Sequence, residues 1–179
     1  TTLTLLHVAH NRICEEGIVA IVESQLNNPL TKVATLKLDG NTPGLRGAQV
    51  LSEPISGSSV LSRLQLCPCA ITARELSPLV DALVLSPGLK ALELAGNAIG
   101  FAGASVMAEA LHKITALSSL DLSHNAIGNA GIAALSTADE YGAGDSENGR
   151  GLCENRSLRS LDLSHNDLRF LEADRSRFM

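Results

Sequence analysis

The chain has 179 residues, of which 45% are hydrophobic and only 2% aromatic, and its formal net charge is -5. This length allows one domain with a sizeable core, and a core with so few rings must be filled by Leu, Ile, Val and Ala. The negative charge disfavours nucleic acid as a partner, and no apolar run approaches the length of a membrane span.

A short apolar pattern recurs along the chain and ends each time in an Asn or a Cys. These anchor residues are Asn11, Asn41, Cys69, Asn97, Asn125 and Asn166, and the steps between them are 30, 28, 28, 28 and 41 residues. Apolar residues stand eight, five and three positions before each anchor, as Leu89, Leu92 and Leu94 do before Asn97. Because side chains alternate along a strand, the pattern predicts one short strand per repeat. We expect the anchor side chain to bond backbone groups that the following turn leaves unpaired.

An apolar position, a glycine and an amphipathic segment follow most anchors. The apolar residues, two positions after the anchor, are Ile13, Ile71, Ile99, Ile127 and Leu168. The glycines, six positions after it, are Gly17, Gly47, Gly103 and Gly131. We expect the glycine to allow a tight turn into a helix that covers the strands. Pro54 and Gly57 predict that the second helix is short and broken.

This pattern is similar to that of leucine-rich repeats, L-x-x-L-x-L-x-x-N/C-x-L. The 28-residue step and the continuation "NxIGxxG" resemble the ribonuclease-inhibitor-like subfamily, as in ribonuclease inhibitor, the sensor domains of NOD-like receptors and Ran GTPase-activating proteins. The resemblance covers nearly the whole chain. It implies an α/β solenoid of about six strand units, with parallel strands on the concave face and helices on the convex face.

The ends of the chain and its cysteines suggest its context. Repeat arrays need polar caps, and neither end shows one, so we expect residues 1–179 to form a single array that is a fragment of a longer chain. The cysteines have neither the paired spacing of a zinc site nor that of a disulfide framework. We therefore expect reduced thiols in a cytoplasmic or, alternatively, a nuclear protein. The four cysteines are Cys14, Cys67, Cys69 and Cys153.

The long last step contains an insertion, "STADEYGAGDSENGRG", at residues 136–151. Its acidic, Gly- and Ser-rich composition predicts an exposed loop. It is either a tolerated insertion or a binding loop on one face of the array. The spacing of its polar residues does not match a calcium loop. The candidate binding residues are Asp139, Glu140, Tyr141, Asp145 and Glu147.

The residue between the two strand leucines is expected to point out of the concave face. This column reads His7, Lys37, Gln65, Glu93, Asp121 and Asp162. Neighbouring strands lie about 4.8 Å apart, so stacked carboxylates should raise one another's pKa or recruit a cation. A second column, two positions later, leaves room for a partner and reads Ala9, Asp39, Cys67, Ala95, Ser123 and Ser164. Both columns are either ordinary solvated positions or an interface whose acidic end meets a basic partner.

The stretch "LDLSHN" occurs twice and pairs Asp121 with His124 and Asp162 with His165. A catalytic or metal site needs groups that converge in a pocket. A strand residue and a residue three positions later, past a turn, tend to face different directions, so we predict neither role. The chain also lacks a Gly-rich phosphate loop and a nucleophile elbow.

The sequence predicts a non-enzymatic protein–protein interaction scaffold without cofactor or metal. Its predicted partner is a protein with a basic surface, bound through the concave face. The resemblance also leaves open a regulator of a small GTPase, of the GTPase-activating type, or an innate-immune-like ligand-sensing domain. The GTPase-activating proteins carry a strongly acidic tail after their repeats, whereas this chain ends in a neutral, Arg-containing segment.

Overall fold

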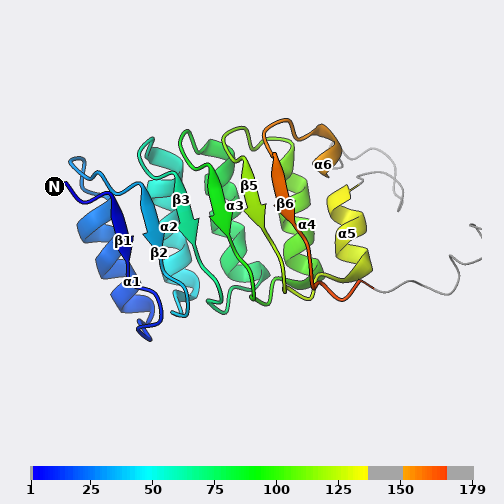
Figure 1. Cartoon of the computed structure of the whole chain (residues 1–179), viewed down its shortest axis with the longest axis horizontal. Coiled ribbons are helices and arrows are strands. Elements are labelled where there is room, and N and C mark those ends of the chain that lie inside the picture. Colours follow the sequence, from blue (N-terminus) through cyan, green and yellow to red (C-terminus); the bar gives the residue numbers. More distant parts are fainter. Residues whose placement is uncertain (1, 137–150, 169–179) are drawn as a thin grey trace, which may run out of the picture.

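The structure, a computed structural model, describes residues 2–136 and 151–168. In these ranges the strands form one parallel sheet in chain order, and the helices pack behind it as a second layer (Figure 1). The strands are β1 (Leu5–His7), β2 (Thr35–Lys37), β3 (Arg63–Gln65), β4 (Ala91–Glu93), β5 (Ser119–Asp121) and β6 (Ser160–Asp162). The helices are α1 (Glu15–Ile21), η1 (Val22–Leu26), α2 (Gly44–Gly57), α3 (Ala73–Leu85), α4 (Gly100–Leu111), α5 (Gly128–Ser136) and α6 (Gly151–Glu154). None of the helices in the described ranges has the length and hydrophobicity of a bilayer span.

The core lies between the two layers and consists of the leucine columns. In the four central repeats the two strand leucines are at most 1% exposed: Leu36, Leu38, Leu64, Leu66, Leu92, Leu94, Leu120 and Leu122. Burial of one such side chain contributes roughly 1.5–3 kcal/mol. The equivalent residues of the first and last repeats are only partly buried, because each of those repeats packs against a single neighbour in the structure: Leu6, Val8, Leu161 and Leu163.

The anchor asparagines join each repeat to the one before it, and Asn97 shows how. Its Oδ1 accepts the N–H groups of Cys69 at 2.7 Å and Ile71 at 3.0 Å. Its Nδ2 donates to the carbonyls of Leu66 and Leu94, both at 2.7 Å. The other buried anchors make bonds of the same type. The predicted role of the anchor is therefore confirmed: it satisfies backbone groups that the turn leaves unpaired.

Cys69 is the anchor that departs from Asn, and it faces a repeat that lacks a donor. By analogy with the other anchors, an Asn at position 69 would accept hydrogen bonds from the N–H groups of Asn41 and of residue 43. Pro43 has no N–H, and the N–H of Asn41 already donates to the Leu38 carbonyl at 3.2 Å. The thiol of Cys69 donates to the same carbonyl at 3.3 Å. The Cys69 thiol thus needs no N–H group from residue 43, which suits a repeat that carries Pro43.

The glycine column does not form tight turns, so that prediction is wrong. Its members lie inside helices, and none has a positive φ: Gly17, Gly47, Gly103 and Gly131. A Cβ on Gly103 would collide with Cγ2 of Ile99 and lie 3.3 Å from Cδ2 of Leu76. Glycine is required here because the apolar residue two positions after the anchor packs directly against it.

Helix α2 runs without interruption over 14 residues, so the prediction of a short, broken helix is also wrong. Pro54 lies near the end of the helix, where it removes a single backbone bond, to the carbonyl of Val50. Leu51, Pro54 and Ile55 are buried on the core side of the helix. The N–H of Ser58 still bonds the Pro54 carbonyl at 3.1 Å. Packing of this face offsets the lost bond.

Candidate functional site

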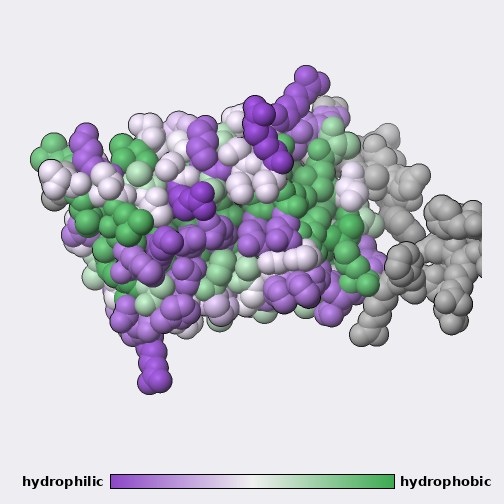
Figure 2. Space-filling model, viewed as in Figure 1, coloured by the Kyte–Doolittle hydropathy of each residue, from purple (hydrophilic) through white to green (hydrophobic). Residues whose placement is uncertain are grey.

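The sheet face that the helices leave uncovered, here called the open face, carries one polar side chain from the end of each strand. The predicted residues are opposite one another in the strand register: His7, Lys37, Gln65, Glu93, Asp121 and Asp162. A core leucine precedes each of them, so strand alternation turns these side chains outward, and all are half-buried or exposed. Figure 2 shows hydrophilic surface running across the strands on this face. The structure therefore brings the whole predicted column together.

Sequence reasoning missed a further column on the open face, which stands two positions before the first. It includes Arg63 on β3, whose guanidinium forms an ion pair with Glu93 on β4 at 2.5 Å. The side-chain amide of Gln65 donates to the same carboxylate. The strand period of two could have placed Arg63 on this face. The pair partly neutralises Glu93, one of the three residues of the predicted acidic end.

The two aspartates of the acidic end bond to their own turns. The N–H of Ser123 donates to Asp121 and the N–H of Ser164 donates to Asp162, both at 2.9 Å. The N–H and the hydroxyl of Ser164 hold the pKa of Asp162 below its ordinary value of 3.8. The expectation that facing carboxylates raise each other's pKa is therefore wrong for Asp162, because these donors stabilise its ionised form.

The histidines of the two "LDLSHN" copies stack on each other. The ring centroids of His124 and His165 are 4.1 Å apart, and their planes differ by 8°. Both residues take a left-handed backbone conformation, with φ of 55° and 56°. Positive charge on either ring would also favour the ionised form of Asp162. Over residues 2–136 and 151–168, however, no three His, Cys, Asp or Glu side chains are grouped so as to hold a metal ion.

Two cysteines lie at or beneath the open face. Burial raises the pKa of the Cys67 thiol to about 12 and that of Cys69 to about 11. The N–H of Cys67 donates to the carboxylate of Asp39 at 2.8 Å, which ties β3 to β2. A thiol reacts as its thiolate, and at neutral pH both groups remain protonated. Neither cysteine therefore provides a nucleophile on this face.

The second predicted site, the insertion loop at 136–151, lies outside the described residues except for its first and last positions, which belong to helices. Its candidate residues are Asp139, Glu140, Tyr141, Asp145 and Glu147. The segments on either side are described: α5 ends at Ser136 and α6 begins at Gly151. A role in binding for this loop stays a prediction.

Comparison with known proteins establishes the fold. The Leucine Rich repeat family matches residues 1–22, 86–108, 113–136 and 154–169. Among solved structures, the chain is similar to the actin-binding site 2 of leiomodin-1, with a TM-score of 0.61 and 15% identity over 89% of this chain and 82% of that chain. No curated protein matches the chain. The family matches, the structural likeness and the sheet of in-register strands show that the chain has the α/β solenoid fold of leucine-rich repeats.

Proposed function

We propose that the chain is a non-enzymatic scaffold that binds a protein partner through its open face. The observation that supports this most is the unbroken column of outward-facing residues from His7 on β1 to Asp162 on β6. The leucines that flank the column are required by the core, whereas the polar residues between them are not. Such a surface extends across the whole sheet, as broad protein interfaces do.

The charge of the open face favours a partner with a basic surface at the β5–β6 end. Glu93 is already paired with Arg63. Asp121 and Asp162 have no Lys or Arg partner within the described part of the chain. A basic group on the partner would find these two carboxylates side by side on adjacent strands. Complementary charge of this kind directs association and sets the orientation of a partner.

Other features agree with this proposal. The leiomodin-1 domain of similar fold is described as an actin-binding site, which supports a protein as the partner. The 28-residue step supports a ribonuclease-inhibitor-like type of repeat. Cys14, Cys67 and Cys69 form no disulfide with one another among the described residues, which supports a reducing compartment such as the cytoplasm.

Removal of charge at Asp121 and Asp162 tests the proposal. Asparagine keeps the side-chain oxygen that accepts the serine N–H and removes only the charge, so the variant Asp121→Asn/Asp162→Asn should keep the fold. Affinity purification from a cell extract with quantitative mass spectrometry then compares the captured proteins. We expect the captured amount of the specific partner to fall about 10-fold, which corresponds to a loss of about 1.4 kcal/mol of binding free energy.

A matched control removes two exposed carboxylates from the helical layer. Glu23 on η1 and Asp81 on α3 are both exposed and lie away from the open face. The variant Glu23→Gln/Asp81→Asn should capture the same proteins as the wild type. Retention of every partner by the Asp121→Asn/Asp162→Asn variant would refute the proposal, and so would an equal loss in both variants.

A further inference from the structure

Four exposed cations gather where the last strands begin, on a border that we call the strand-entry edge. Lys90 directly precedes β4, and Arg159 directly precedes β6. Lys113 and Arg156 lie in the connections that lead to β5 and β6. Figure 2 shows strongly hydrophilic side chains projecting from this edge of the sheet. The edge is distinct from the open face, whose column stands at the other end of each strand.

Main-chain bonds place Lys90 and Arg159 close together. The N–H and hydroxyl of Ser118 donate to the Lys90 carbonyl at 2.9 and 3.0 Å. The Ser118 carbonyl in turn accepts the N–H of Arg159 at 2.8 Å. Because neighbouring strands are about 4.8 Å apart, the two cationic residues are separated by roughly 10 Å along the sheet.

The other two cations are joined in the same way through Ile114. Its carbonyl accepts the Nδ2 of Asn155 at 3.2 Å and the hydroxyl of Ser157 at 2.8 Å. Arg156 stands between those two donors, and Lys113 directly precedes Ile114. The side chains of Lys113 and Arg156 therefore leave the chain from neighbouring segments.

Little on the described part of the chain neutralises this charge. Among the described residues none of the four cations takes part in an ion pair. The carboxylates at the adjoining helix ends are Glu109 on α4 and Glu154 on α6. The dipole of α4 accounts for a cation at Lys113, but Lys90 and Arg159 adjoin strands. On a chain with a net charge of -5, this is a local surplus of positive charge.

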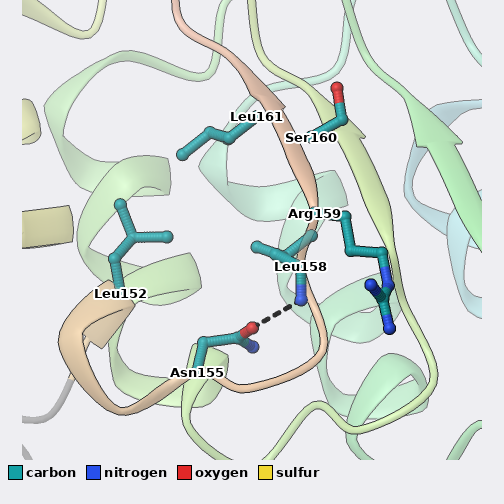
Figure 3. Close-up of a pocket in the computed structure, with 6 residues that line it drawn as sticks. All are labelled: Leu152, Asn155, Leu158, Arg159, Ser160 and Leu161. Atoms are coloured by element: carbon teal, nitrogen blue, oxygen red, sulfur yellow. Dashed lines mark hydrogen bonds between the residues drawn. The ribbon is translucent and has the colours of Figure 1, made fainter.

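A pocket of about 200 Å³ opens beside these cations, between α6 and β6 (Figure 3). Its lining residues are Leu152, Asn155, Leu158, Arg159, Ser160 and Leu161. The side chains of Leu152 and Leu161 point toward each other in Figure 3. Asn155 shapes one wall, because its Oδ1 accepts the N–H of Leu158 at 2.8 Å. Arg159 belongs both to the pocket and to the group of cations.

We propose that the strand-entry edge binds an acidic segment of a partner protein, which places one aliphatic side chain in the pocket between α6 and β6 and its carboxylates on the four cations. The pocket provides the apolar anchor site that protein interfaces use near their centre. The cations provide a charged rim that selects an acidic sequence around the anchor. This surface and the β5–β6 end of the open face have opposite charge, so they fit different partner segments.

Two labelled peptides test the proposal by fluorescence anisotropy at low salt. One has a leucine between two runs of five glutamates, and the other has a serine in its place. We expect the leucine peptide to bind about 10-fold more tightly, since it buries one aliphatic side chain. We expect about 10-fold lower affinity for both peptides in each of two variants, Lys90→Gln/Arg159→Gln and Lys113→Gln/Arg156→Gln. Leu152→Ala should abolish the preference for the leucine peptide.

The matched control is Lys32→Gln/Arg74→Gln, which removes two exposed cations from other parts of the array. It should leave both affinities within about 2-fold of the wild type. Absence of binding, an equal loss in the control, or equal affinity for the two peptides would overturn the proposal. Binding to phosphatidylserine-containing vesicles without peptide binding would also overturn it, in favour of a membrane surface. The exposed Gln variants should fold normally, which circular dichroism checks.

The outcome is independent of the proposed function of the open face. Asp121→Asn/Asp162→Asn removes negative charge elsewhere and should not weaken the acidic peptides. Conversely, the Lys and Arg variants should retain any basic partner of the open face. Each interface can therefore fail without the other.

Discussion

Asp121 and Asp162 lie directly opposite each other on β5 and β6, although the insertion at 136–151 separates them in the sequence. The strand register is therefore continuous across the insertion. The two carboxylates do not behave as an isolated like-charged pair. Asp162 instead has a lowered pKa, because the N–H and hydroxyl of Ser164 bind its ionised form.

The first prediction concerns the titration of Asp162. In Ser164→Ala the backbone N–H remains and the hydroxyl is lost, so the pKa of Asp162 should rise but stay below 3.8. Carbon-detected NMR of the side-chain carboxyl measures the midpoint, and Ser160→Ala on the same strand is the control. A wild-type midpoint above 3.8 would contradict the assignment.

The lowered pKa also fixes the direction of the pH effect on stability. A carboxyl whose pKa is lower in the folded state stabilises the fold at a pH above its unfolded-state pKa, here 3.8. That contribution is lost as the pH falls through the folded-state pKa. The difference in the free energy of unfolding between wild type and Asp162→Asn should therefore shrink on acidification. If the two proteins differ by the same free energy of unfolding at pH 7 and at pH 3, the pKa of Asp162 does not contribute to stability in this way.

The third prediction concerns the glycine column. Gly103→Ala introduces a methyl group against Ile99 and Leu76 in the core, and overpacking of this kind costs about 1–3 kcal/mol. Gly57→Ala, in another helix, meets no atom within 4 Å. It should be neutral or stabilise the fold by up to about 1 kcal/mol, since alanine loses less entropy in a helix. Urea unfolding measures both, and equal effects would contradict the packing explanation.

The repeating columns of the fold could be predicted from the sequence because each recurs at a fixed spacing. Spacing alone decides which face a strand residue takes, and it gave the leucine core and the bonding role of Asn97. The role of Gly103 could not be predicted in this way, because it depends on where the side chain of Ile99 lies. The continuity of α2 through Pro54 likewise depends on tertiary packing, which outweighs local preference.

In the candidate site, too, the features that follow from repeat spacing could be predicted, and the side-chain contacts could not. The order of His7 to Asp162 across the open face follows from alternation and repeat length. The pairing of Arg63 with Glu93 depends on two side-chain conformations. The stacking of His124 on His165 depends on a left-handed turn in each repeat. Such contacts between side chains carry no periodic signal in the sequence.

The last prediction tests whether Cys69 and Pro43 compensate each other. Cys69→Asn alone places a buried amide oxygen opposite a residue without an N–H, so it should bring no gain and cost up to about 2 kcal/mol. Pro43→Ile restores both the donor and the apolar residue found at this position in other repeats. The double variant should then be more stable than the sum of the single effects by about 1 kcal/mol.

A double-mutant cycle from urea unfolding measures this coupling, with Cys69→Ala in place of Cys69→Asn as the control. Alanine offers no acceptor, so its coupling to Pro43→Ile should be near zero. Additive effects in the Asn cycle would show that the two departures from the pattern are independent. Favourable coupling in the Asn cycle alone would instead assign the effect to one bond, from the N–H of residue 43 to the anchor oxygen, as Ile71 bonds Asn97 in the next repeat.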